Sequence, residues 1–202
     1  MSAASTSASK EWVLEPETEY RFELDPGTSL AIKLAKGHAE VFGAELAEGK
    51  TYLFGHECKA AIFTWQGCTI EMSPLPVSPF LLQSKNRPEI VQHVTGHPST
   101  EYVSEETPMY AYANAHLALE AMRVRALRAL HGSPPPTSPP ETKQDAPSEP
   151  PRVLVLGPEN SGKTTVCKIL INYAVRAGQD WTPLYVNVDP SEVRFIFFEI
   201  AF

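Results

Sequence analysis

A glycine-bracketed loop that follows an apolar run constrains this chain more than any other feature. Residues 157–164 read G-P-E-N-S-G-K-T, which is a complete G-x-x-x-x-G-K-[ST] motif. The four apolar residues before it, 153–156, predict a strand buried on both faces, and the segment after Gly162 predicts a helix. A strand, this loop and a helix in that order are the context in which the motif binds phosphates, whereas a simple glycine turn is the alternative.

The residue types of the loop suit the phosphates of a nucleotide. Gly157 and Gly162 can adopt backbone angles closed to other residues, so that successive N–H groups turn inward at the positive end of a helix. Lys163 supplies a mobile cation for the β- and γ-phosphates, and Thr164 can place its hydroxyl on Mg²⁺. The motif therefore predicts a bound nucleotide with Mg²⁺.

The residues after the loop predict one more helix and one more strand of a parallel sheet. Apolar residues recur with helical spacing from Val166 to Ala177, and Gly178 follows as a cap. Residues 184–188 predict a second buried strand, and Asp189 stands at its carboxyl end. Because ligands bind at that edge of such sheets, Asp189 is a candidate for holding Mg²⁺ or for accepting the proton of a substrate hydroxyl; the alternative is an Asp-Pro turn.

The N-terminal part of the chain has a different pattern. Short β-type runs separated by glycine and other turn residues predict a small antiparallel sandwich or barrel. The runs are 20–24, 30–34, 39–42, 51–54, 60–65 and 69–72. Residues 73–98 contain five prolines and no sustained period, so they interrupt this pattern as a loop or insertion.

A long helix and a proline-rich linker connect the two parts. Thr107 predicts an N-cap, and Pro108 the first position of a helix that continues to Leu130 and stops at Gly132. Residues 133–151 hold eight prolines among nineteen residues and predict an extended linker. The expected fold is multi-domain α/β: a disordered N-terminus (1–10), an antiparallel β-sandwich (11–106), the linking helix (107–132), the linker (133–151), the incomplete start of a P-loop domain with a parallel sheet (152–191) and an atypical tail (192–202).

Composition and charge argue against several classes of function. The net charge of −7 over 202 residues argues against a sequence-blind electrostatic grip on nucleic acid. Three cysteines without paired spacing predict a reducing compartment and neither a disulfide framework nor a structural metal. No stretch of the sequence predicts a membrane span.

Five short stretches carry a resemblance to a known family. They are A-E-V-F-G-A-E-L (39–46), F-T-W-Q-G-C (63–68), Y-V-S-E-E-T-P-M (102–109), the loop G-P-E-N-S-G-K-T (157–164) and Y-V-N-V-D-P (185–190). Together with the order of strands, helix and loop, they resemble the fungal Clp subunits of mRNA cleavage and polyadenylation factor IA over residues 11–72 and 101–191. These subunits are relatives of the eukaryotic polynucleotide 5′-hydroxyl kinases.

The resemblance implies a nuclear, ATP-binding subunit required for endonucleolytic cleavage of pre-mRNA before polyadenylation, with ATP mainly a structural ligand. It implies other cleavage factor IA subunits as partners, above all the scaffold subunit that binds the RNA polymerase II tail, with pre-mRNA contacted indirectly and no membrane. Carried over by motif, Glu19 and Lys59 would contact the nucleoside, although without the resemblance they are ordinary charges at strand edges. The phosphates would be held by Asn160, Ser161, Gly162, Lys163, Thr164 and Thr165.

The alternative function is an active ATP-dependent polynucleotide 5′-hydroxyl kinase, with Asp189 as its catalytic residue. The family continues beyond the position of residue 191 with an arginine-bearing lid, so we expect an inactive kinase-like domain and weak nucleotide binding here. Residues 73–98 and 192–202 depart from the family pattern as translated intron sequence would. We therefore expect a truncated product.

Overall fold

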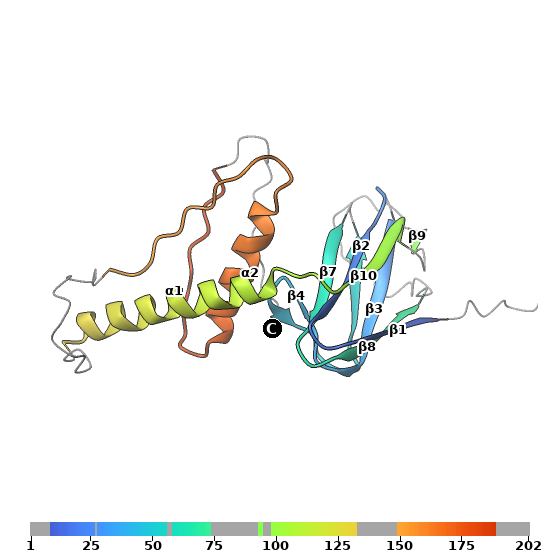
Figure 1. Cartoon of the computed structure of the whole chain (residues 1–202), viewed down its shortest axis with the longest axis horizontal. Coiled ribbons are helices and arrows are strands. Elements are labelled where there is room, and N and C mark those ends of the chain that lie inside the picture. Colours follow the sequence, from blue (N-terminus) through green and yellow to red (C-terminus); the bar gives the residue numbers. More distant parts are fainter. Residues whose placement is uncertain are drawn as a thin grey trace, which may run out of the picture.

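A computed structural model shows a domain of strands followed by two helices, α1 (Met109–Leu130) and α2 (Lys163–Arg176) (Figure 1). It describes residues 9–26, 28–55, 58–73, 93–94, 98–132 and 149–188. The strands are β1 (Lys10–Leu14), β2 (Thr18–Glu23), β3 (Thr28–Gly37), β4 (Glu40–Val41), β5 (Ala44–Glu45), β6 (Thr51–Gly55), β7 (Lys59–Thr64), β8 (Cys68–Ser73), β9 (His93–Val94) and β10 (Thr100–Ser104).

The strands form two sheets, which confirms the predicted N-terminal sandwich. One sheet has the order β1-β8-β3-β6, with β9 also paired to β3, and the other has the order β10-β2-β7-β4-β5. All strand pairs are antiparallel except β3 with β9. β9 lies in the predicted insertion 73–98, of which residues 74–92 and 95–97 lie outside the described residues.

The core of the sandwich lies between the two sheets, because alternate residues of each strand point inward. The inward residues include Tyr20 on β2, Ile32 on β3 and Ile70 on β8, each at most 1% exposed. Full burial of a side chain of this size stabilises the fold by about 1.5–3 kcal/mol. The sheet that carries β2 and β7 is thereby fixed in place, with its outer face available to the helices.

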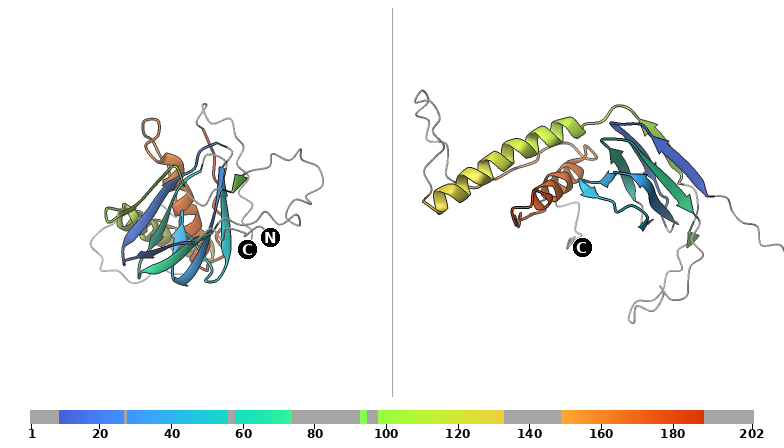
Figure 2. Two further views of the ribbon diagram at one scale, coloured as in Figure 1. Left: turned by 90° about the vertical axis from the view of Figure 1, so that its right-hand side faces the viewer. Right: turned by 90° about the horizontal axis from the view of Figure 1, so that it is seen from below.

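The two helices lie at one side of the sandwich. Figure 2 shows α1 running away from the strands, with α2 beside it and close to β4 and β5. α2 confirms the predicted helix, and Gly178 follows it with a φ of 70°. α1 begins at Met109, one residue later than predicted, because Pro108 takes the N-cap position; the Thr107 hydroxyl still accepts a hydrogen bond from the Met109 N–H at 3.3 Å. Neither of these helices is long and apolar enough to cross a membrane.

The two predicted strands of a parallel sheet are not formed. Residues 153–156 and 184–188 are irregular, and most of their apolar side chains are exposed, with Leu154 at 71% and Leu184 at 89%. A parallel strand needs hydrogen-bonded neighbours and helices on both faces. The described residues offer these segments no further strand to pair with, so their apolar composition alone does not make them strands.

Candidate nucleotide-binding site

The phosphate loop is a tight turn that leads directly into α2. Asn160 and Gly162 have positive φ angles of 58° and 82°, and the Ser161 hydroxyl donates to the Pro158 carbonyl at 2.8 Å. A Cβ added to Gly157 would lie 2.6 Å from the Ser161 Oγ. Both motif glycines therefore stand where a side chain would strain or obstruct the loop.

The loop presents positive groups to an anion. Lys163 extends back across the loop, and its Nζ donates to the Pro158 carbonyl at 2.7 Å. The first N–H groups of α2 lack partners inside the helix, and its first turn contains no acidic residue that would offset the helix dipole. Thr164 and Thr165 belong to this turn. The lysine, the N–H groups and the threonine hydroxyls can thus donate hydrogen bonds to phosphate oxygens, and a threonine hydroxyl oxygen could also ligate Mg²⁺.

A cavity of ≈ 360 Å³ lies between the sandwich and the first half of α2. Glu19 from β2, Lys59 from β7 and Thr165 from α2 all line it. The structure thus brings together three predicted site residues that are far apart in the sequence. The rest of the cavity wall includes Phe42 and Gly43 of the β4–β5 turn, Phe63 of β7, Met109 and Tyr112 of α1 and Ile169 of α2. The predicted residues 160–164 stand in the loop and at the start of α2 rather than in this wall.

Of the charged residues in the cavity wall, the two that the sequence predicted, Glu19 and Lys59, differ in their surroundings. Glu19 is 5% exposed and accepts hydrogen bonds from the Arg21 guanidinium and, at 3.2 Å, from the Thr107 hydroxyl. The side chain of Lys59 is 74% exposed, and its Nζ lies 2.6 Å from a carboxylate oxygen of Glu23. Glu19 is therefore fixed in place, whereas Lys59 is free to move toward a ligand.

Sequence reasoning missed the junction that holds α2 against the sandwich (Figure 1). The Tyr173 hydroxyl and the Arg176 guanidinium both donate to the buried carboxylate of Glu40, Arg176 at 2.7 Å. Burial, followed by the hydrogen bond to Glu40, raises the pKa of Tyr173 above its ordinary value, so the hydroxyl stays protonated and donates. Glu40 and Arg176 are 136 positions apart, so no local pattern in the sequence could have joined them.

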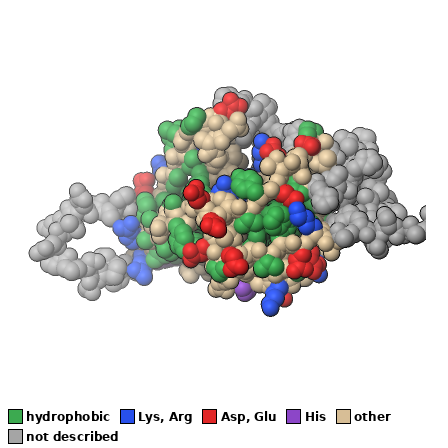
Figure 3. Space-filling model, turned by 45° about the vertical axis from the view of Figure 1, so that its right-hand side comes forward, with side chains coloured by type: hydrophobic (Ala, Val, Ile, Leu, Met, Phe, Trp, Pro, Cys, Tyr) green, Lys and Arg blue, Asp and Glu red, His purple; other side chains and the backbone are tan. Residues whose placement is uncertain are grey.

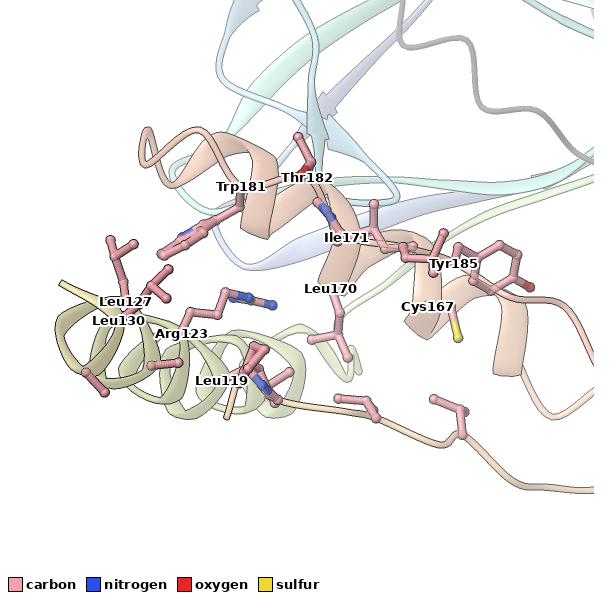
Figure 4. A pocket seen from close by; sticks show the side chains of 18 residues that line it. Leu119, Arg123, Leu127, Leu130, Cys167, Leu170, Ile171, Trp181, Thr182 and Tyr185 are labelled. Atoms are coloured by element: carbon pink, nitrogen blue, oxygen red, sulfur yellow. The ribbon is translucent and has the colours of Figure 1, made fainter. Parts of the chain in front are cut away.

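A larger cavity of ≈ 750 Å³ lies on the other side of α2, between this helix, α1 and the irregular segments (Figure 4). Figure 4 shows Trp181 near Leu127 and Leu130 of α1, and the Trp181 indole N–H donates to Glu120 at 2.8 Å. None of the predicted site residues lines this cavity. Its apolar wall is formed in part by residues 153 and 155, which come from the segment predicted as a strand.

The remaining predicted residue, Asp189, lies outside the described residues. In the part of the chain that the structure describes, no group of three or more His, Cys, Asp or Glu residues could hold a metal ion. On the face of the molecule shown in Figure 3, basic and acidic side chains are interspersed. This face therefore does not present the continuous basic surface that binds nucleic acid without sequence preference.

Two parts of the chain match known protein families, and the full-length relatives carry the same name. Residues 13–126 match the family described as "N-terminal beta-sandwich domain of polyadenylation factor", and residues 157–196 match "mRNA cleavage and polyadenylation factor CLP1 P-loop". The mRNA cleavage and polyadenylation factor CLP1 of Laccaria bicolor is 69% identical over 193 residues, which are 95% of this chain and 34% of that protein. The protein of the same name from Aspergillus clavatus is 41% identical over 201 residues, with 94% and 32% covered. The chain thus spans about a third of the length of these curated relatives.

Two solved structures of Clp1p with Pcf11p share the fold. One, described as the extended interface between the two proteins and the basis for ATP loss in a point mutant, has a TM-score of 0.57 at 19% identity, covering 85% of this chain and 31% of that one. The wild-type complex has a TM-score of 0.56 at 19% identity, covering 85% and 30%. Because the sandwich match spans more than half of the chain and the P-loop match follows it in order, the chain belongs to the mRNA cleavage and polyadenylation factor CLP1 family.

Proposed function

We propose that this chain binds ATP between the phosphate loop and the cavity lined by Glu19 and Lys59. ATP there acts mainly as a structural ligand that joins the sandwich to α2. The main support is that residues of β2 and β7 of the sandwich line the same cavity as Thr165, which belongs to the helix that starts at the loop. A ligand that contacts both walls stabilises their association by its binding free energy.

Each proposed contact follows from the chemistry of a side chain. Glu19 accepts a hydrogen bond from a nucleoside N–H or O–H, and Lys59 donates to a nucleoside acceptor after leaving Glu23. Lys163 and the backbone of residues 160–165 hold the phosphates, and Thr164 orients Mg²⁺, which neutralises phosphate charge when bound. Lys163 is the single basic residue between positions 157 and 167.

That single cation favours a structural role over the alternative, a polynucleotide 5′-hydroxyl kinase. Phosphoryl transfer needs several positive groups around the γ-phosphate and a residue that orients the attacking hydroxyl. The loop supplies one lysine between positions 157 and 167. We therefore place the structural role first and the kinase second.

At the level of the cell, we propose a subunit of the nuclear machinery that cleaves pre-mRNA before polyadenylation. The support is the family, whose members are named mRNA cleavage and polyadenylation factors. The proposed partners are the other subunits of cleavage factor IA, especially the scaffold subunit that binds the RNA polymerase II tail. This part of the proposal draws on the Clp1p structures with Pcf11p, which carry the same fold.

The test is equilibrium dialysis of the 202-residue chain with labelled ATP and Mg²⁺ up to millimolar concentration, together with a transfer assay on a 5′-hydroxyl oligonucleotide. Lys163→Ala should weaken ATP binding by about tenfold or more, since it removes the charge-assisted contacts to the phosphates. Lys36→Ala, at an exposed position of β3, is the control and should bind as the unaltered chain does. ATP binding that ignores Lys163→Ala would refute the site, and lysine-dependent labelling of the oligonucleotide would favour the kinase.

A further inference from the structure

One face of α2 lies toward the sandwich, with the cavity near the start of the helix and direct contacts from Ile169 to Arg176. Thr165, Ile169, Tyr173 and Arg176 are spaced by four, four and three residues, which places them on one side of a helix. Thr165 and Ile169 line the nucleoside cavity, whereas Tyr173 and Arg176 lie beyond it, at the end of the helix away from the phosphate loop. Contacts at this far end therefore influence where the loop end lies.

A buried carboxylate anchors the far end. Glu40 is 4% exposed, and it accepts hydrogen bonds from the Tyr173 hydroxyl and from Arg176 at 2.7 Å. Arg176 also donates to the Gly43 carbonyl at 2.8 Å. Burying a carboxylate costs folding free energy unless it is paired and hydrogen-bonded. The two donors from α2 offset this cost for Glu40, so Glu40 favours the position of α2 in which both donors reach it.

The turn between β4 and β5 brings the sandwich close to the helix backbone. Its central residues, Phe42 and Gly43, have φ angles of 49° and 79°, as a type I′ hairpin turn requires. A Cβ on Gly43 would lie 3.0 Å from the Ile169 carbonyl oxygen. Asn172 donates to the Phe42 carbonyl at 2.8 Å. The distance between turn and helix is therefore set within a few tenths of an ångström.

We propose that Glu40, Tyr173 and Arg176 form a latch that positions the phosphate-loop helix against the nucleoside wall. Tyr173 and Arg176 are positioning residues, because neither is part of the cavity wall. The latch lets one nucleotide reach the loop at its phosphate end and Glu19 and Lys59 at its nucleoside end. This inference rests on the proposed function, since it concerns the same site, and it adds residues that the motif does not include.

The experiment compares two probes that need different parts of the site. ATP needs both the loop and the nucleoside wall, whereas inorganic tripolyphosphate needs only the loop. Arg176→Gln and Tyr173→Phe should weaken ATP binding by about tenfold or more, because the wall is no longer held in register with the loop. Tripolyphosphate binding should change less than about twofold, since the loop and Lys163 are intact. Arg128→Gln, in the last turn of α1, is the matched control and should affect neither probe.

The possible outcomes distinguish failure of the latch from failure of the proposed ATP site. Equal loss of both probes in Tyr173→Phe would overturn the latch, because it would mean that the variant damages the loop or the fold. Unchanged ATP binding in both variants would also overturn it, while Lys163-dependent binding by the unaltered chain would leave the proposed function standing. If the unaltered chain binds ATP no better than Lys163→Ala does, both the proposed function and the latch fail. Far-UV circular dichroism identifies an unfolded Arg176→Gln, in which case Tyr173→Phe, which keeps the ring, decides.

Discussion

A pair of glycine substitutions measures how closely the sandwich and α2 are packed. Gly43 and Gly49 both have a φ of 79°, so alanine at either position adopts the same unfavourable backbone conformation. The surroundings differ. A Cβ at Gly43 would meet the Ile169 carbonyl oxygen at 3.0 Å and the Ile169 Cα at 3.2 Å, whereas at Gly49 nothing lies within 4 Å. Gly49→Ala is therefore the control for the backbone term alone.

The expected magnitudes follow from these contacts. The left-handed backbone costs alanine about 1–2 kcal/mol at either position. At Gly43 the helix must also retreat to an ordinary contact distance, which stretches the hydrogen bonds of Arg176 to the Gly43 carbonyl and of Asn172 to the Phe42 carbonyl. Weakening one charged and one neutral hydrogen bond costs about 1–3 kcal/mol more. We expect Gly43→Ala to lose about 2–5 kcal/mol of the free energy of unfolding, against about 1–2 kcal/mol for Gly49→Ala.

Urea denaturation followed by tryptophan fluorescence and circular dichroism measures both variants under one condition. Hydrogen exchange of the amides of α2 provides a local readout, because a displaced helix exchanges faster than one held by the turn. Equal losses of unfolding free energy in Gly43→Ala and Gly49→Ala, with unchanged exchange in α2, would show that the turn does not press against the helix. The close approach that supports the latch would then be wrong.

Two further predictions concern buried polar groups. Thr64→Val should lower the free energy of unfolding by about 2–4 kcal/mol in urea, because the buried hydroxyl donates to the His38 carbonyl at 2.6 Å and accepts from the Gly67 N–H at 2.9 Å. Thr64→Ser keeps both bonds, and a loss as large as that of Thr64→Val would contradict the argument. Burial, followed by the charge of Arg123, lowers the pKa of His116 from its ordinary 6.5, while Glu120 acts in the opposite direction. The unfolded chain then binds the proton more tightly, so the stability that neutral His116 contributes is present above pH 6.5 and is lost as the pH falls through the lowered pKa. Thermal unfolding between pH 7.5 and pH 5 should show a smaller decrease in His116→Phe, and an identical decrease in both chains would count against this assignment.

The sandwich could be predicted because its strands carry their own signals. In the run 20–24 inward and outward residues alternate, turn residues end each strand, and the buried Tyr20 is at an inward position. β1, β5, β9 and β10 lie outside the predicted runs. β5 has only two residues, too few for a period, and β10 is defined by its pairing with β2 rather than by its own pattern.

The predicted parallel strands failed for a different reason. Residues 153–156 and 184–188 have the apolar composition of buried strands. Such a composition favours burial, but it does not show that neighbouring strands and helices are present to bury the segment. The candidate site likewise has one part that could be predicted from the sequence and one part that could not. The loop was predictable because its chemistry is local, whereas Glu40 and Arg176 meet only through the packing of α2 on β4.

The two lysines of the proposed site donate to different acceptors, so the two ends of the site differ in charge. Lys59 lies 2.6 Å from the carboxylate of Glu23, so the pair is nearly neutral when viewed from solution. Lys163 is held by the uncharged carbonyl of Pro158 at 2.7 Å, so its full charge projects into the solvent around the loop. Of these two lysines, Lys163 is thus the one paired with an uncharged group, so in the proposed ATP site its charge would attract the phosphates to the loop end.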